Sequence, residues 1–459
     1  MGRLTGEVRW VPLLSALVVA DVAFSFLQTA IIPTIPTVSR ELAMPPEWSA
    51  WLLSAYLMVA TVATPALGRL ADLRGRRRVL LVSLVLFLVG AAGAAVAPNA
   101  AVLVVFRAVQ GIGGPVFPLA FAVVREVAPP ERVSGAVGLL TAAFGIGAAL
   151  GFGFGGLFAQ LVSWRLVFVA GALAVGVSTV LVALLVPARP APAAGTFDGL
   201  GALLVGTASV GVLLALTSGV QLGWSAPGTV ALFLLAAGTA GWWVRHELVS
   251  PDPLVDLRVL SHRAVALTNL ATVGLGWALF GSYFLLPELV RAVPDQDGYG
   301  FGADATWAGL YLLPVAVGQL LAGPLAARVQ RRCSARTVFA AGLVLLTAAL
   351  IGLDLVHTAA PAFAACVFVL GVGAGLAMQT SSAVSTSAVG PEHAGISTTL
   401  NSTVRRFAGG AGSQVSAALL GALTSAAHPP AHLAFVLAFT AAAVLALLAS
   451  GAALLIRAG

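Results

Sequence analysis

Apolar runs long enough to cross a bilayer recur along the whole of this chain. A hydrocarbon core of about 30 Å needs roughly 20 apolar residues per helical crossing. Hydrophobic residues make up 59% of the 459 residues and charged residues only 9%, whereas soluble domains carry about 25% charged residues. The sequence therefore predicts an all-α integral membrane protein with fourteen transmembrane helices and no large domain outside the membrane. The predicted spans are 11–33, 48–68, 79–97, 101–123, 134–157, 166–186, 199–219, 228–244, 264–286, 305–327, 337–356, 360–384, 395–424 and 430–456.

The distribution of arginine predicts how these spans are oriented. The net charge is +7, and all 24 basic residues are arginine. When the spans alternate from a cytoplasmic N-terminus, the inner segments hold eighteen arginines and the outer loops hold three, Arg40, Arg165 and Arg291. An excess of positive charge is expected on the cytoplasmic side. We therefore expect both termini in the cytoplasm, and we attribute the basic charge to membrane topology rather than to a nucleic-acid partner.

An internal repeat relates two distant parts of the chain. A shift of 255 residues, without gaps, maps Tyr56 onto Tyr311 and the pair Arg76-Arg77 onto Arg331-Arg332. Secondary transporters are often built from duplicated halves, with the substrate site between them. We therefore predict an N-terminal six-helix bundle, a linker with two inserted transmembrane helices, and a C-terminal six-helix bundle. Their predicted bounds are 1–186, 187–263 and 264–459.

The most specific local pattern lies between the second and third predicted spans. Residues 68–78 read Gly-Arg-Leu-Ala-Asp-Leu-Arg-Gly-Arg-Arg-Arg. Gly75 permits a tight reversal, and Asp72 can pair with neighbouring arginines or lie against a helix N-terminus. Topology alone explains the arginines but not the Gly-x-x-x-Asp-x-x-Gly frame. We expect this loop to be a gate that locks one closed state through Gly68, Asp72, Arg74, Gly75, Arg76 and Arg78.

This loop resembles the signature between helices two and three of the major facilitator superfamily. Three further motifs resemble the drug/proton antiporter branch of that superfamily. They are Arg107-Ala-Val-Gln-Gly-Ile-Gly in helix four, Ser163-Trp-Arg-Leu-Val-Phe at the start of helix six, and Arg405-Arg-Phe-Ala-Gly-Gly-Ala-Gly in helix thirteen. With fourteen spans, the resemblance extends over the whole chain. It implies two bundles that alternate access to a central site, export driven by the proton gradient, and a part for Arg107 in proton coupling.

Two positions depart from the pattern of that branch. Helix one of the branch usually carries Leu-Asp-x-Thr, and here Leu27 stands at the position of the acid. Helix five of the branch carries Gly-Pro-x-x-Gly-Gly, and here Phe152 replaces the proline. These departures leave open a dedicated exporter of one endogenous metabolite or lipid, or a symporter. A non-transporting membrane receptor that has kept the fold is an alternative from another class.

Asp21 is the leading candidate for a proton carrier. It lies about ten residues into helix one, roughly 15 Å deep at the helical rise, and an ionisable group near the bilayer centre indicates function. Asp21, Phe24 and Gln28 share one helix face, which suits a cavity wall. Burial favours the protonated acid and a nearby cation favours the carboxylate, so alternating surroundings make a proton switch. The alternative is a structural ion pair with a buried arginine, for which Arg107 is the candidate.

Several other polar residues fall inside predicted spans. Arg107 and Arg405 do not belong against lipid, so each should face the cavity or a partner within the protein. Because Arg405 and Arg406 project about 100° apart, at most one can point squarely into the cavity. Single polar groups in spans could equally form helix-to-helix hydrogen bonds. The predicted substrate-cavity residues are Phe24, Gln28, Tyr56, Gln110, Tyr283, Tyr311, Gln379, Asn401 and Arg405.

No pattern in the sequence predicts an enzyme. His262 and His393 lack metal-ligand spacing to cysteine or to a second histidine, and a chain without lysine has no Walker motif. We expect a secondary transporter of the bacterial plasma membrane that exports small amphipathic compounds, as a multidrug or antibiotic exporter. It should need no cofactor or metal, since the proton gradient supplies the energy. The expected partners are a small-molecule substrate, protons and the lipid bilayer, and we expect a monomer.

Overall fold

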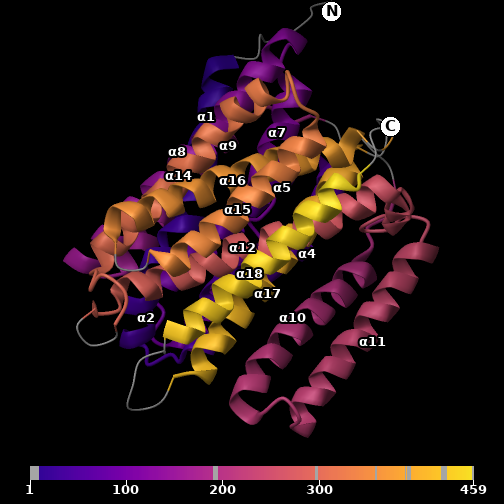
Figure 1. Cartoon of the computed structure of the whole chain (residues 1–459). Coiled ribbons are helices and arrows are strands. Elements are labelled where there is room, and N and C mark those ends of the chain that lie inside the picture. The colour runs from indigo at the N-terminus through magenta and orange to yellow at the C-terminus, as the bar shows by residue number, and fades with distance from the viewer. Residues whose placement is uncertain are drawn as a thin grey trace, which may run out of the picture.

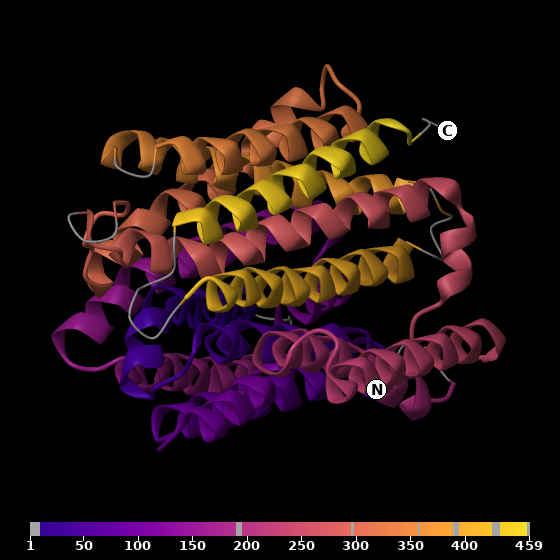
Figure 2. The same cartoon turned by 60° about the horizontal axis from the view of Figure 1, so that its bottom comes forward.

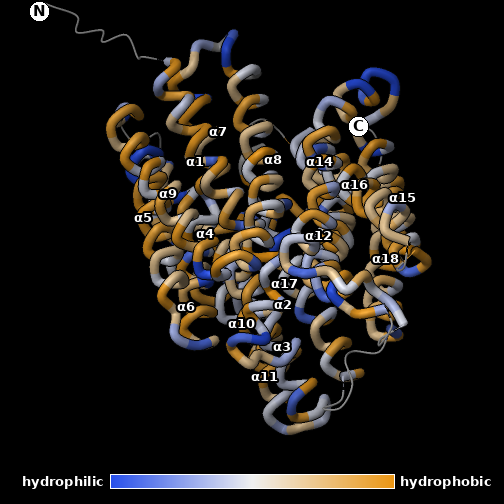
Figure 3. Tube along the Cα trace, turned by 90° about the vertical axis from the view of Figure 1, so that its left-hand side faces the viewer, coloured by the Kyte–Doolittle hydropathy of each residue, from blue (hydrophilic) through white to orange (hydrophobic). Residues whose placement is uncertain are grey.

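Helices account for the regular structure of the described chain, as the hydropathy of the sequence predicts (Figure 1). The computed structural model describes residues 10–189, 195–294, 298–356, 359–387, 389, 394–424 and 432–456. Hydrophobic residues dominate the middle of the helices, and hydrophilic residues gather toward the two ends (Figure 3). A bilayer core admits this pattern because helices satisfy their own backbone polar groups. The prediction of an all-α membrane protein is confirmed.

The number of membrane-length helices is close to the number predicted. Thirteen helical segments of the described chain are long and apolar enough to cross a membrane. The one predicted span outside these thirteen is 395–424, which corresponds to α17 (Ala394–Ala422), a helix of 29 residues. Its serines, threonines and two arginines lower its hydropathy, so it is not among the thirteen. It nevertheless packs along both α4 and α12, and it therefore completes the set of fourteen.

The first half of the chain forms one group of helices. Helix α1 packs against α8 and α9, α5 packs against α6 and α9, and α4 packs against α6. The elements are α1 (Trp10–Ala30), η1 (Ile32–Thr34), α2 (Ile35–Glu41), α3 (Pro46–Ser49), α4 (Trp51–Arg74), α5 (Arg76–Ala95), α6 (Ala100–Gly111), α7 (Val116–Val127), α8 (Pro130–Leu161) and α9 (Arg165–Leu185).

The remaining helices form a hairpin and a second group. In the second group α12 packs against α17 and α18, α15 packs against α16 and α18, and α14 packs against α16. The hairpin consists of α10 (Gly199–Leu222) and α11 (Pro227–Val249), followed by η2 (Leu257–Ser261). The second group consists of α12 (Arg263–Arg291), α14 (Ala305–Val329), α15 (Ala335–Leu355), α16 (Ala360–Ser387), α17 and α18 (His432–Leu454).

Local sequence explains where several helices begin and break. Asn99 caps α6, and its side chain accepts a hydrogen bond of 3.0 Å from the Val102 amide. Asp304 caps α14 in the same way, at 2.9 Å from the Trp307 amide. One predicted span is divided into α6 and α7 by a turn that ends at Pro115, because proline cannot donate a helical hydrogen bond.

The two halves are closed together at one end and diverge toward the other. They meet along α8–α14 and α4–α17. We name the end that carries residues 68–78 and 328–336 the arginine-rich end. At the opposite end, a Cβ atom on Gly156 would lie 2.0 Å from the Ala305 carbonyl oxygen, so α8 and α14 are in backbone contact there. Toward the arginine-rich end α8 and α14 separate (Figure 3), and a Cβ on Gly135 would meet no atom within 4 Å.

The inserted hairpin lies over the line where the halves meet through α4 and α17. Helix α10 packs against both of those helices, whereas α11 packs against α10 and η2 (Figures 1 and 2). Leu213 of α10 is fully buried in a cluster with Met58 of α4 and Ala411 of α17. The indole of Trp51 donates a buried hydrogen bond of 3.0 Å to the Thr217 hydroxyl. The hairpin is therefore hydrogen-bonded to the first half while it also packs on the second.

The close contact between α8 and α14 predicts a way to disturb the closed end. Gly156→Ala should force the two backbones apart, because overpacking a tight contact costs about 1–3 kcal/mol. We expect a cysteine at Ala305, which is 1% exposed, to react with a membrane-impermeant maleimide about fivefold faster or more in this variant. The background would carry C333S and C366S. Gly153→Ala is the matched control, because its Cβ meets open space; equal rates in the two variants would refute the prediction.

Candidate functional site

The predicted gate loop forms the arginine-rich ends of α4 and α5. Gly75 adopts φ +92°, a conformation that favours glycine, and it ends α4 immediately before α5. Arg76 lies 3.8 Å from the carboxylate of Asp72 and 3.3 Å from that of Glu126. Arg74 and Arg78 are exposed, and a Cβ on Gly68 would meet open space. In this conformation both ion pairs of Arg76 are thus formed with acids of the first half.

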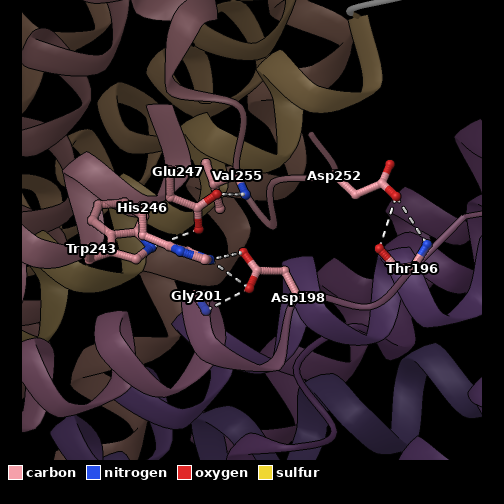
Figure 4. Close-up of polar contacts among 8 residues, drawn as sticks. All are labelled: Thr196, Asp198, Gly201, Trp243, His246, Glu247, Asp252 and Val255. Carbon is pink, nitrogen blue, oxygen red and sulfur yellow. Dashed lines mark hydrogen bonds and ion pairs between the residues drawn. The ribbon is translucent and has the colours of Figure 1, made fainter. Parts of the chain in front are cut away.

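A second contact joins this loop to the inserted segment. Arg69 donates a hydrogen bond of 3.1 Å to Asp252, which follows α11. The other oxygen of Asp252 accepts from the amide and the hydroxyl of Thr196, at 3.1 and 2.9 Å (Figure 4). These hydrogen bonds from Thr196, and then the charge of Arg69, hold the pKa of Asp252 below its ordinary value. Asp252 therefore connects the segment before α10 and the segment after α11 to α4. No sequence motif predicted this role for Asp252.

The same end of the hairpin carries further polar contacts (Figure 4). Asp198 caps α10 by accepting from the Gly201 amide at 2.8 Å, and it lies 2.9 Å from Nε2 of His246. Glu247 accepts from the Trp243 indole at 2.8 Å and from the Val255 amide at 3.1 Å. Because these side chains are satisfied by one another, they stabilise the fold of the hairpin. Among the described residues no group of three or more histidine, cysteine or acidic side chains is placed to hold a metal ion.

Asp21 lies in the middle of α1 and is completely buried, with 0% of its surface exposed. Neither of its carboxylate oxygens has a hydrogen-bond partner within the described structure. Ser25, one turn further, donates to the Phe144 carbonyl at 2.6 Å and holds α1 against α8. Phe24 lies between the rings of Phe87 and Phe144, with centroids 5.2 and 6.3 Å away. The carboxylate is thus held in largely apolar surroundings with no compensating charge in contact.

Two other residues of α1 complete this part of the site. Gln28 is half-buried, and its side-chain oxygen is buried without a hydrogen-bond partner. Leu27, at the position where the antiporter branch has its acid, is fully buried. A Cβ on Gly171 of α9 would lie 2.2 Å from its side chain. Position 27 therefore packs against α9 within the first half.

Arg107 is buried beside Tyr56 and Gln110 in the first half. Its Nε donates to the Leu52 carbonyl at 2.8 Å, one Nη donates to the Gln110 side-chain oxygen, and its charge lies 5.1 Å from the Tyr56 ring centre. The other Nη, the Gln110 side-chain nitrogen and the Tyr56 hydroxyl have no hydrogen-bond partner in the described chain. No ion pair joins Arg107 to Asp21 within the described residues. The alternative considered for Asp21, a structural ion pair with Arg107, is therefore not present in this structure.

The two adjacent arginines of α17 have different surroundings. Arg406 reaches across to the first half, where it donates to the Thr64 hydroxyl and to the carbonyls of Ala60 and Gly114, the latter two at 3.3 and 3.2 Å. Arg405 is half-buried, and it forms no hydrogen bond or ion pair within the described chain. The 100° rotation between neighbours explains the difference. Arg406, absent from the predicted site, is thus a contact between the halves.

The predicted cavity residues of the second half fall into two groups. Asn401 is buried and joins three helices, since it donates to Thr272 at 2.8 Å and accepts from Ser381 at 3.1 Å. Tyr311 is half-buried and stacks on Phe301 toward the closed end. Both residues therefore have packing roles in this conformation.

Tyr283 and Gln379 are placed differently. Tyr283 accepts a hydrogen bond of 3.0 Å from Gln319, and its ring lies 5.6 Å from that of Phe152 of the first half. Gln379 is exposed on α16. Phe152, the residue that replaces the proline of helix five, is therefore part of the contact between the halves.

Comparisons with known proteins agree with this arrangement. The sequence model of the Major Facilitator Superfamily matches residues 17–413 and 297–458 of this chain. The chain belongs to the Major Facilitator Superfamily. It is a multi-pass membrane transporter and not an enzyme.

Several relatives cover most of the chain. The multidrug resistance protein B homolog of Mycobacterium tuberculosis (strain ATCC 25618 / H37Rv) is 30% identical over 383 residues, which cover 81% of this chain and 69% of the relative. Multidrug resistance protein 3 of Bacillus subtilis (strain 168) is 26% identical over 365 residues, which cover 78% of this chain and 69% of the relative.

Two solved structures share the fold. A crystal structure of a peptide transporter POT in complex with sulfate has a TM-score of 0.73 at 16% identity, with 99% of this chain and 95% of that chain covered. A crystal structure of the human organic anion transporter MFSD10 (TETRAN) has a TM-score of 0.64 at 16% identity, with 97% and 99% covered. At this identity the two structures support the fold alone.

The tether at Asp252 predicts a local change that exchange measurements can detect. Asp252→Ala should speed hydrogen exchange of the Thr196 amide by roughly fivefold, because that amide loses its acceptor. Because the pKa of Asp252 is lowered, the tether persists above the ordinary aspartate value near 3.9 and is lost as pH falls through the lowered value. Protection of Thr196, corrected for the intrinsic rate, should therefore stay constant from pH 7 to about pH 5.

The control for this measurement comes from the same loop. Asp256→Ala removes a carboxylate that accepts a hydrogen bond from the Arg258 amide and has no contact with Thr196 in the described chain. It should leave the exchange of Thr196 unchanged. If protection of the Thr196 amide is lost already at pH 6, or if it survives Asp252→Ala, Asp252 is not the acceptor that protects this amide.

Proposed function

We propose that this protein is a proton-coupled exporter of small amphipathic compounds that works by alternating access. Its place is the plasma membrane of a bacterium, with both termini and the arginine-rich end in the cytoplasm. The observation that carries the proposal is the carboxylate of Asp21, which is 0% exposed and has no partner at either oxygen. An isolated buried charge is costly, so binding and release of a proton at this position change the stability of the conformation that encloses it.

The substrate class is supported by the relatives. The mycobacterial and Bacillus proteins named above are called multidrug resistance proteins, and they are 30% and 26% identical to this chain. Half-buried aromatic residues and separate polar groups between the helices suit a site that accepts varied compounds. We therefore assign small amphipathic molecules, including antibiotics, as the class that is exported.

The observed conformation supplies one state of the cycle. The halves are closed where Gly156 meets Ala305 and where Arg291 donates to Thr37 at 2.7 Å. They diverge at the arginine-rich end (Figure 3). An excess of arginine marks the cytoplasmic side, so this state takes up substrate from the cytoplasm. Export then requires the halves to rock until α8 and α14 part at the closed end.

Two buried groups in the first half serve as coupling residues in this proposal. Asp21 exchanges the proton. Arg107, with one Nη that has no hydrogen-bond partner among the described residues, supplies a fixed positive charge in the same bundle. A change in the distance between these two charges during rocking would alter the affinity of Asp21 for the proton. The loop at residues 68–78 changes its ion pairs as its end of the bundle closes.

Proton coupling can be measured in liposomes that contain the purified protein and a trapped pH dye. Under an imposed proton gradient, addition of a transported amphiphile from a panel of cationic, neutral and anionic compounds should cause proton movement. Asp21→Asn should reduce this movement to the level of protein-free liposomes, because an amide cannot exchange the proton.

Asp304→Asn is the matched control. It removes the same charge from the cap of α14, and asparagine is an equally good cap, so proton movement should be retained. Substrate-dependent proton movement that survives Asp21→Asn would refute the assignment of Asp21, and compound movement without any proton movement would refute proton coupling.

A further inference from the structure

Three arginines lie near the contact between the halves, and their partners are neutral. Arg107 donates to the Leu52 carbonyl and to an amide oxygen of Gln110. Arg406 donates to two carbonyls and to a hydroxyl of the first half. Among the described residues, no carboxylate forms an ion pair with Arg107, Arg405 or Arg406. The positive charge of this region is therefore not cancelled by acids in contact with it.

The acids of the described chain that form ion pairs do so elsewhere. They pair near helix ends, with arginines or with His246, and none of these pairs includes one of the three central arginines. Those pairs are Arg69–Asp252, Arg76–Asp72, Arg76–Glu126, Arg165–Glu41 and His246–Asp198. Asp21 is buried within the first half without a partner. The excess of positive charge is thus a property of the folded protein and not only of its composition.

Arg405 differs from the other two arginines in the availability of its guanidinium. Arg107 is 0% exposed, and Arg406, although half-buried, is occupied by acceptors of the first half. Arg405 is half-buried and has no hydrogen-bond or ion-pair partner in the described chain. It is the twelfth residue of α17, roughly 18 Å from the helix start at the arginine-rich end, which is the end where the halves diverge. An ionised guanidinium in such a position is available to an anion.

The surroundings of Arg405 suit the apolar part of a ligand. Helix α12 packs so closely on α17 that a Cβ on Gly276 would lie 2.2 Å from the Arg405 carbonyl oxygen. On the next turns Gly409 lies against the Phe280 ring and Gly412 against the Trp277 backbone of α12. Both aromatic side chains are half-buried. A guanidinium within two turns of half-buried aromatic residues suits a molecule with one anionic group and an apolar body.

We propose that Arg405 binds the carboxylate of an anionic amphiphile that enters between the two halves from the arginine-rich end. This proposal deepens the export function and rests on it, because it names the charge class that the transport site prefers. A planar guanidinium can donate two parallel hydrogen bonds to a carboxylate, and charge-assisted bonds of this kind are strong. The uncancelled charges of Arg406 and Arg107 add to the attraction at longer range and oppose the entry of cationic compounds.

The test compares three fluorescent ligands of matched size with purified wild-type protein at pH 7. Pyrenebutyrate is anionic, its amide is neutral, and pyrenebutylamine is cationic. Fluorescence anisotropy gives a dissociation constant for each. We expect affinity to fall in the order pyrenebutyrate, amide, amine, and we expect pyrenebutyrate to bind about tenfold more tightly than the amide.

Three variants assign the preference to Arg405. In R405Q the affinity for pyrenebutyrate should fall about tenfold while the affinity for the amide stays within about twofold, which also shows that the variant is folded. R405K keeps the charge but not the planar pair of donors, so its affinity for pyrenebutyrate should lie between those of wild type and R405Q. R245Q removes an equal charge from the exposed end of α11 and should leave all three affinities unchanged.

The outcomes separate this proposal from the export function. Equal affinity for the three ligands, tighter binding of the amine, no saturable binding of pyrenebutyrate, or an unchanged pyrenebutyrate affinity in R405Q would each overturn the role of Arg405. These results would leave the proton measurement on Asp21 unaffected. Charge-selective binding without substrate-dependent proton movement would instead retain the role of Arg405 and refute proton-coupled export.

Discussion

The low dielectric constant of the bilayer core governs this structure, because a polar group placed there must find its partner within the protein. The backbone meets this requirement by forming helices. Arg406 meets it with carbonyl and hydroxyl oxygens of neighbouring helices, and Arg107 meets it in part, with the Leu52 carbonyl and the Gln110 amide oxygen. Asp21 and Arg405 are the informative exceptions, since neither side chain has a hydrogen-bond or ion-pair partner within the described chain. Groups left in this condition are the ones that can exchange a proton or bind an ion.

The contact between the halves is asymmetric, and small residues make it so. Glycine at position 156 allows the backbones of α8 and α14 to meet at one end, while polar contacts such as Arg406 with Thr64 lie near the middle. The hairpin of α10 and α11 covers the line between α4 and α17 and is hydrogen-bonded to the first half through Thr217 and Asp252. These attachments indicate that the hairpin moves together with the first half when the two halves rock.

Different parts of the site differed in how well the sequence predicted them. The position of Gly75 at a reversal followed from its neighbours alone, and the structure has it there with φ +92°. The ion pair considered between Asp21 and Arg107 is not formed, because α1 and α6 turn these side chains toward different neighbours. Asp252 carried no motif, since its importance comes from Arg69 and Thr196, which are distant in sequence. Contacts of this kind depend on how helices are rotated and packed, which apolar periodicity does not encode.

The class of the protein, the number and approximate bounds of its helices, and the superfamily were all predictable from the amino-acid order alone. Those properties follow from apolar run length, from the positions of proline and glycine, and from local motifs, all of which act over short stretches of chain. The packed helices were needed to show which end is closed, which of the adjacent arginines Arg405 and Arg406 joins the halves, and which charges lack a partner. The properties of a charge in a low-dielectric interior depend on what surrounds it in space, and those surroundings come from helices far apart along the chain.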